Sequence, residues 1–248
     1  QPVKEHRAVL VIRGEGLAEE IQETDPQRLG KLPLPPLALA PVATVTERIL
    51  AGVIKQAGEI LADEPKANMM LLRGYAKYRR YPSLYERYRL NALAIASYPM
   101  YRGIARLLGM TIAAPTETIE EEIAILKQEY QNYDFFFIHV KATDSRGEDG
   151  DFDGKVKVIE QVDSLLPDII ALRPEVLVVT GDHSTPAALA GHSWHPVPVI
   201  LAAPTCRPDL VAYFSERDCI HGGLGRMPMM YLMGQSLAHA RRLEKFGA

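Results

Sequence analysis

Length, composition and charge describe an ordinary globular protein. A chain of 248 residues can bury a sizeable core, and 47% hydrophobic with 24% charged residues is typical of neither a disordered nor a fibrous protein. The net charge of −3 lacks the basic excess of nucleic-acid-binding proteins, so small molecules are the expected partners. Two cysteines are too few for a disulfide framework, and no apolar run reaches the roughly 20 residues of a membrane span. We therefore expect a cytoplasmic protein that binds neither membrane nor nucleic acid.

The first part of the chain is predicted to hold two strands and one helix. An apolar strand is expected over residues 8–12, and because Gln1 is not an initiator methionine we expect a truncated N-terminus. Periodic apolar residues predict a helix from about 44 to 62, and residues 69–72 are predicted to form a buried strand. A tract rich in Tyr, Arg and Lys follows Gly74, which predicts a domain boundary there.

The second part alternates strands with helices. Strands are predicted at 92–96, 135–140, 176–179 and 197–201, and helices near 101–109, 117–131, 154–166, 184–190 and 228–245. This rhythm predicts an α/β fold with a largely parallel sheet flanked by helices. In such sheets ligands bind beyond the carboxyl ends of the strands.

Acidic and histidine side chains follow these strands. They gather in three segments, residues 141–151, 180–184 and 191–196, which a parallel sheet would bring to one edge. Aspartate carboxylates mixed with histidine imidazoles suit Mn²⁺ or Zn²⁺, and two such ions can clamp a phosphoryl group. The alternative interpretation is a set of unrelated turns and helix caps.

One acidic pattern has the spacing of a calcium loop. Asp149, Asp151, Asp153 and Glu160 fit the EF-hand spacing, but an EF-hand needs a helix before the loop, and here a strand is predicted only a few residues upstream. We expect Asp153 to cap the following helix instead. His139, inside that strand, is expected to be a hydrogen-bonded core residue.

Three arginines lie beside the predicted strands of the first part. They are Arg7, Arg13 and Arg73. A planar guanidinium can hold a phosphate or a carboxylate through two hydrogen bonds. Exposed arginines are also commonly just solvated, so both interpretations stay open.

Several segments together resemble one known family. They are His6-Arg7, residues 13–17, 66–68, 72–74, 101–103 and 109–110, Asp144 with the residue four further on, Thr180-Gly-Asp-His-Ser-Thr-Pro, His192-Ser-Trp-His-Pro-Val-Pro and the terminal Lys245-Phe-Gly-Ala248. Over nearly its whole length the chain resembles the cofactor-independent phosphoglycerate mutases of archaeal type, members of the alkaline phosphatase superfamily. The resemblance implies an incomplete alkaline phosphatase-like core, residues 75–248, and most of a smaller inserted α/β domain that binds substrate, residues 1–74.

The resemblance also implies two divalent metal ions, foremost Mn²⁺, with Zn²⁺, Co²⁺ or Mg²⁺ as alternatives, and no bisphosphoglycerate. One ion would bind Asp144, Glu148 and His192, and the other Asp182 and His183 together with an Asp and the nucleophilic Ser of an upstream segment. Glu148 stands where the family commonly has His, which leaves its role as a ligand and the choice of metal open. No serine of this chain matches the nucleophile, and Ser184 is expected to be a helix N-cap.

The implied reaction interconverts 3-phosphoglycerate and 2-phosphoglycerate through a phosphoserine. Arg7, Arg13 and Arg73 would orient the substrate carboxylate and phosphate, and this chain alone is expected to be inactive. Two alternatives remain at this point: a two-metal phosphomonoesterase or phosphodiesterase of the same superfamily, or a catalytically silent binding protein. Self-association of the chain is possible.

Overall fold

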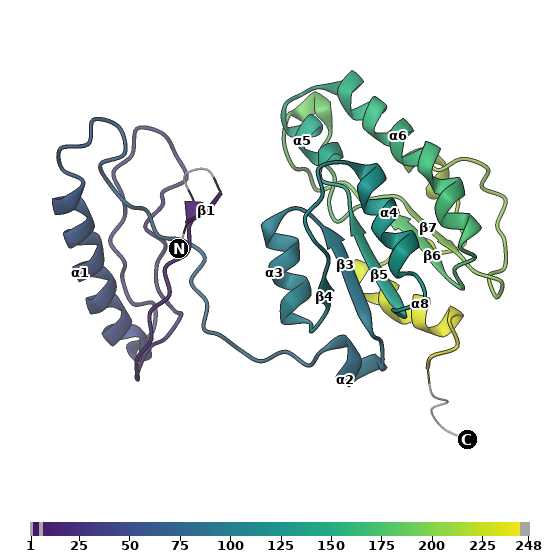
Figure 1. Ribbon diagram of the computed structural model, residues 1–248. Helices are drawn as coiled ribbons and strands as arrows, with labels where there is room; N and C mark the ends of the chain where they lie inside the picture. The colour runs from purple at the N-terminus through teal and green to yellow at the C-terminus, as the bar shows by residue number, and fades with distance from the viewer. Residues whose placement is uncertain (1, 5–6, 244–248) are drawn as a thin grey trace. The chain divides into compact units, whose positions relative to one another are not determined.

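A computed structural model describes residues 2–4 and 7–243 of the chain (Figure 1). The chain divides into two compact units, residues 1–80 and 81–248. Residues 67–83, which include the expected boundary after Gly74, have no regular secondary structure. Gln1, His6 and the segment Lys245–Ala248, all used in the sequence argument, lie outside the described residues.

The first unit is built around one helix. Strands β1 (Pro2–Lys4) and β2 (Arg7–Ala8) pair antiparallel, and η1 (Pro41–Ala43) leads into α1 (Thr44–Ile60), which confirms the predicted helix. A small core joins this helix to distant loops through Ile21, Ala43 and Leu50, with Leu72 and Tyr75 packed against them.

Two strand predictions in this unit are wrong. Residues 9–12 are not in a strand, and Val9, Leu10 and Val11 remain about half exposed. The segment 69–72 runs past Thr24 instead of entering a sheet: Thr24 N donates to Leu72 O at 2.9 Å and Leu72 N donates to Thr24 Oγ1 at 2.6 Å. The backbone amide and the side-chain hydroxyl of one residue, Thr24, thus take the place of a partner strand.

The second unit alternates strands and helices as predicted. Its elements are α2 (Leu84–Tyr88), β3 (Ala92–Ala96), α3 (Pro99–Leu107), β4 (Thr111–Ile112), α4 (Ile119–Glu129), β5 (Phe135–His139), α5 (Ala142–Glu148), α6 (Phe152–Ala171), β6 (Leu177–Thr180), η2 (Ala187–Leu189), β7 (Val199–Ala202), α7 (Glu216–Cys219), η3 (Met229–Tyr231) and α8 (Leu232–His239). The α/β class is confirmed.

A parallel three-stranded sheet forms the centre of this unit, with β3 between β4 and β5 (Figure 1). Alternate residues of β3 face opposite layers, as the period of two in a strand requires. Ala92 and Ala94 pack in one cluster with residues of α2, α3 and α8. Leu93 and Ile95 pack in a second cluster with residues of α4 and α6. Helices therefore cover both faces of the parallel sheet.

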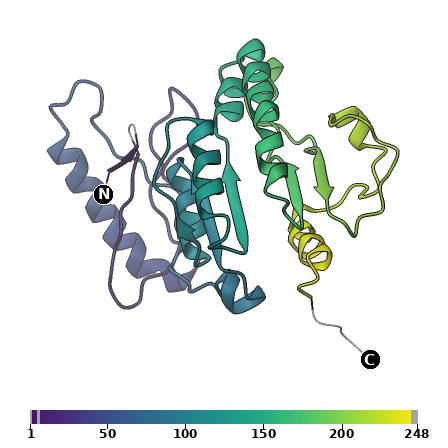
Figure 2. The ribbon, with the colours of Figure 1, turned by 45° about the vertical axis from the view of Figure 1, so that its right-hand side comes forward.

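The prediction of one largely parallel sheet is wrong for the last two strands. β6 and β7 pair antiparallel in a sheet of their own, seen in Figure 2 as two light-green strands apart from the teal sheet. A parallel partner would need a crossover, usually a helix, and the expected helix 184–190 is only the 3-10 turn η2. The expected helix 228–245 is likewise shorter, with η3 followed by α8. Among the described residues, no helix combines the length and apolar character needed to cross a membrane.

Candidate metal centre

The ends of β5 and β6 carry the predicted ligands. α5 begins three residues after β5 and presents Asp144 and Glu148, which are four positions apart and so lie on one helix face. Asp182 and His183 follow β6 after one glycine, Gly181. His192 arrives on a returning loop, which is fixed where Ser193 N donates to Ser184 O at 2.9 Å.

Three of these side chains converge. Asp144, His183 and His192 each offer one ligand atom, and these atoms lie within 4.8 Å of one another. Asp144 Oδ1 is 3.8 Å from His183 Nδ1 and 3.6 Å from His192 Nε2, and the centres of the two imidazole rings are 4.1 Å apart. The family resemblance assigns Asp144 and His192 to one ion and His183 to the second. In the structure, His183 lies as close to Asp144 and His192 as a shared site would require.

The remaining two predicted ligands flank this trio. Glu148 Oε1 lies 3.3 Å from His192 Nε2, and Asp182 Oδ2 lies 3.5 Å from His183 Nε2. All five predicted metal residues therefore form one connected group of three carboxylates and two imidazoles. Their convergence was expected from a parallel sheet, but it is achieved although β6 belongs to an antiparallel pair.

Asp144 is the most enclosed member of the group. Thr185 Oγ1 donates to its Oδ1 at 2.5 Å, and the Lys141 ammonium contacts its Oδ2. Partial burial opposes ionisation, but the hydrogen bonds from Lys141 and Thr185 outweigh it and hold the pKa of Asp144 below its ordinary value. The carboxylate is therefore charged at neutral pH.

Asp182 is held by a tyrosine from another part of the unit. The hydroxyl of Tyr101, in α3, donates to Asp182 Oδ2. Partial burial again opposes ionisation, yet this bond and backbone hydrogen bonds keep the pKa of Asp182 below its ordinary value. Burial, and then the bond to Asp182, raise the pKa of Tyr101, so its hydroxyl remains protonated and able to donate.

Tyr101, Lys141 and Thr185 also belong to the site, and none of them was predicted as a site residue from the sequence. Lys141 and Thr185 lie inside the motifs that were singled out, so closeness to the acidic residues could have indicated them. Tyr101 gave no local signal of contact with Asp182, because the two residues meet only through tertiary structure.

A close backbone approach holds the site together. A Cβ added at Gly147 of α5 would lie 2.2 Å from Thr185 O, so only glycine lets the helix pass so near the loop. Lys155 Nζ, from α6, donates to the same carbonyl at 2.6 Å. The loop that carries His183 is thereby fixed against both α5 and α6.

Two predicted helix caps are wrong. Ser184 caps no α-helix, since its hydroxyl donates to His195 O at 3.1 Å and so ties the two histidine segments together. Asp151, not Asp153, caps α6 by accepting from Gly154 N at 2.9 Å. The expectation that only a strand precedes the acidic loop is also wrong, because helix α5 precedes it. The spacing still forms no calcium loop, since α6 begins at Phe152 and leaves no open loop of 12 residues.

His139 is not the hydrogen-bonded core residue that was expected. Its Nδ1 is buried without a hydrogen-bond partner among the described residues. Its ring stacks on that of Tyr101, with 3.8 Å between ring centres. Burial lowers the pKa of His139, so this ring is neutral at neutral pH.

The arginines of the first unit have separate surroundings. Arg13 is exposed, and Arg73 Nη1 lies 3.5 Å from Asp25 Oδ2 with its side chain 63% exposed. The side chain of Arg7 lies outside the described part of the structure. The guanidinium groups of Arg13 and Arg73 are therefore exposed to solvent.

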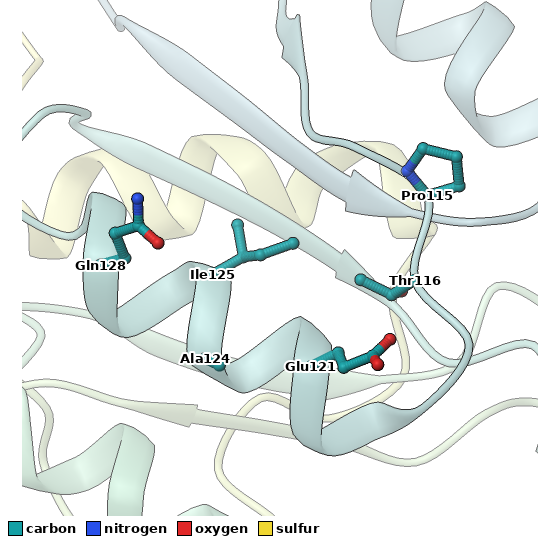
Figure 3. Close-up of a pocket in the computed structure, with 6 residues that line it drawn as sticks. All are labelled: Pro115, Thr116, Glu121, Ala124, Ile125 and Gln128. Atoms are coloured by element: carbon teal, nitrogen blue, oxygen red, sulfur yellow. The ribbon is translucent and has the colours of Figure 1, made fainter.

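A shallow depression elsewhere in the second unit has a different character. It is lined by Pro115, Thr116, Glu121, Ala124, Ile125 and Gln128, on α4 and the loop before it (Figure 3). None of the five predicted metal residues lines it. The depression is therefore separate from the group of predicted metal residues at the ends of β5 and β6.

Comparison with known families decides the broader class. Residues 20–238 match the family described as the metalloenzyme superfamily. The chain belongs to this superfamily. The matched range contains Asp144, Glu148, Asp182, His183 and His192, the residues that form the cluster described above.

Curated relatives point to one kind of enzyme. The chain is 49% identical over 247 residues to a Thermotoga neapolitana protein named probable 2,3-bisphosphoglycerate-independent phosphoglycerate mutase. It is 48% identical over 248 residues to a Thermus thermophilus protein of the same name. The match covers 100% and 98% of this chain, and 62% and 61% of those relatives. This metalloenzyme chain thus spans less than two thirds of their length.

Two solved structures share the architecture. A Pyrococcus horikoshii protein matches with a TM-score of 0.67 and 30% identity over 71% of this chain and 57% of its own. The cofactor-independent phosphoglycerate mutase of Thermoplasma acidophilum matches with a TM-score of 0.63 and 22% identity, over 92% of this chain and 61% of its own. The second likeness supports the fold alone.

Proposed function

We propose that this chain carries most of the metal centre of a 2,3-bisphosphoglycerate-independent phosphoglycerate mutase. The observation that carries the proposal is the convergence of Asp144, His183 and His192 within 4.8 Å in a metalloenzyme-superfamily chain. The identity of 49% to a relative named for this reaction supports it.

The donor set fits divalent cations. Carboxylate oxygens and imidazole nitrogens together suit Mn²⁺ and Zn²⁺. Asp144, Glu148 and His192 would hold one ion, and Asp182 and His183 would contribute to the second. Bound there, divalent ions would supply Lewis-acid stabilisation of the transferring phosphoryl group and lower the pKa of a nucleophilic hydroxyl.

The chain's own residues prepare this centre. Thr185 and Lys141 keep Asp144 ionised and oriented. Both carboxylates with lowered pKa values, Asp144 and Asp182, are ready to bind a cation at neutral pH without first losing a proton. Lys155 anchors the loop that carries His183. A centre ordered in this way avoids reorganisation at the moment of reaction.

The proposed reaction moves a phosphoryl group from the 3-hydroxyl to the 2-hydroxyl of glycerate by way of a serine. That serine is not assigned to any residue of this chain. Arg7, Arg13 and Arg73 are proposed to bind the carboxylate and phosphate of the substrate, for which paired guanidinium hydrogen bonds are suited. The chain alone is therefore proposed to bind metal without completing the reaction.

Phosphorus NMR tests the proposal. The chain is incubated with Mn²⁺ and 3-phosphoglycerate, without bisphosphoglycerate, either alone or joined to the part of the Thermotoga neapolitana relative that it does not match. We expect 2-phosphoglycerate only with the joined form. The same joined form carrying Asp182→Asn is the matched control, and it should produce no 2-phosphoglycerate.

The other possible functions give different spectra. Accumulation of inorganic phosphate would identify a hydrolase, in which water reaches the phosphorylated centre. Unchanged 3-phosphoglycerate in the joined form, with Mn²⁺ bound, would identify a binding protein. Turnover by the chain alone would contradict the assignment of the nucleophile to another segment.

A further inference from the structure

A tyrosine outside the three segments predicted to hold metal ligands contacts the proposed metal centre. Tyr101 lies in the first turns of α3, and its hydroxyl donates to Asp182 Oδ2. The two residues are far apart in sequence, so the contact depends on the tertiary fold. The same carboxylate oxygen also lies 3.5 Å from His183 Nε2.

The ring of Tyr101 packs against a side chain of β5, that of His139. Ala96 of β3 pairs with His139 of β5, which places the beginning of α3 beside the end of β5. The Tyr101 ring stacks on the His139 imidazole at 3.8 Å between centres, with 30° between the ring planes. Phe137, also in β5, extends this aromatic contact, with its ring centre 6.3 Å from that of Tyr101. The hydroxyl is therefore presented by a ring that has little freedom to move.

The same end of α3 also faces the other carboxylate. Lys141 Nζ lies 5.0 Å from the centre of the Tyr98 ring and contacts Asp144 Oδ2. Tyr98 precedes α3 directly. The beginning of α3 thus contacts both carboxylates. Tyr101 donates to Asp182 directly, and Tyr98 supports the ammonium group of Lys141, which contacts Asp144.

We propose that Tyr101 is a positioning residue that holds the carboxylate of Asp182 in its metal-binding orientation. This inference rests on the proposed metal centre. A carboxylate on a loop can rotate, and a hydrogen bond to one of its oxygens selects one rotamer. Outer groups that orient a ligand in this way typically contribute 10- to 100-fold to metal affinity. His139 supports Tyr101 in turn, because its imidazole ring stacks on the tyrosine ring.

Metal binding to variants of this chain tests the role of Tyr101. Mn²⁺ affinity is measured by isothermal titration calorimetry for the wild-type chain, Tyr101→Phe, Asp182→Asn and the double variant. Tyr101→Phe keeps the stacked ring and removes only the hydroxyl, and far-UV circular dichroism checks the fold. Tyr85→Phe is the matched control, because Tyr85 is 59% exposed in α2 and is not part of the site.

We expect Tyr101→Phe to raise the Kd for Mn²⁺ about ten-fold, and Tyr85→Phe to leave it within two-fold. Asp182→Asn retains Asp144, His183 and His192, so binding remains measurable. Because the hydroxyl acts through Asp182, adding Tyr101→Phe to Asp182→Asn should change the Kd less than two-fold.

The other outcomes separate this inference from the proposed function. If the wild-type chain binds Mn²⁺ and Tyr101→Phe binds it equally well, the positioning role is wrong and the metal centre stands. The positioning role would also be wrong if the two substitutions raised the Kd for Mn²⁺ by independent factors that multiply in the double variant. Tyr101 would then affect Mn²⁺ binding by a route other than Asp182. If the wild-type chain binds no Mn²⁺, the metal centre is wrong and this inference falls with it.

Discussion

Among the individual side chains, Glu122 of α4 is a buried carboxylate outside the proposed metal centre. It is only 6% exposed, and its Oε2 has no hydrogen-bond partner among the described residues. Thr116 Oγ1 donates to the other oxygen at a long 3.4 Å. Burial raises the pKa of Glu122 from 4.5 to about 7, and the Thr116 bond offsets only part of this rise. The residue is therefore half protonated near neutral pH.

This shift predicts a pH-dependent stability. The pKa of Glu122 is higher in the folded state than in the unfolded chain. Between about pH 4.5 and 7, Glu122 is therefore protonated to a greater extent in the folded state than in the unfolded chain. The contribution of Glu122 to the free energy of unfolding should fall as pH rises through this window, by at most roughly 3 kcal/mol. Glu122→Gln removes the titration. Urea unfolding at pH 5 and pH 8 should show the variant gaining stability relative to wild type at the higher pH.

A neighbouring glutamate provides the control for this effect. Glu121 precedes Glu122 in α4 but is exposed, so Glu121→Gln is the control that removes a carboxylate from the same helix without changing a buried group. If Glu122→Gln and wild type show the same difference at pH 5 and pH 8, Glu122 does not carry a raised pKa in the folded protein.

At the scale of elements, the approach of α5 to the loop after β6 sets the geometry of the proposed metal centre. Gly147→Ala would place a Cβ 2.2 Å from the Thr185 carbonyl, so the helix or the loop must shift. We expect a loss of about 1–3 kcal/mol in the free energy of unfolding, with weaker Mn²⁺ binding because Asp144 and His183 move apart. Denaturant unfolding and calorimetric Mn²⁺ titration measure both effects.

The matched glycine lies in α3. A Cβ at Gly103 would meet nothing within 4 Å, so Gly103→Ala should instead add about 0.5–1 kcal/mol through the higher helix propensity of alanine. Equal effects of the two substitutions would show that the backbone contact between α5 and Thr185 does not constrain the site.

The sequence could predict those parts of the site that follow a strand in the chain. Asp144 comes after the apolar run of β5, and Asp182 and His183 come after β6, so local patterns indicated where they would lie. The antiparallel pairing of β6 with β7 could not be predicted, because an apolar run does not specify the direction of its partner. Tyr101 was missed for a related reason: the pairing of Ala96 with His139 brings the start of α3 beside the end of β5, and no spacing in the sequence encodes that pairing or the contact of Tyr101 with Asp182.

At the scale of the whole molecule, the five predicted metal residues all belong to the unit of residues 81–248, whereas Arg7, Arg13 and Arg73 belong to residues 1–80. Metal binding should therefore not depend on the connection between the units. A short Gly-Ser insertion between Arg80 and Tyr81 should leave the Kd for Mn²⁺ within two-fold of wild type in calorimetric titration. The same insertion after Gly150, between α5 and α6, should abolish binding, because it separates Gly147 and Lys155, which both approach the Thr185 carbonyl. Loss of binding with the first insertion would mean that the metal centre needs ligands from residues 1–80.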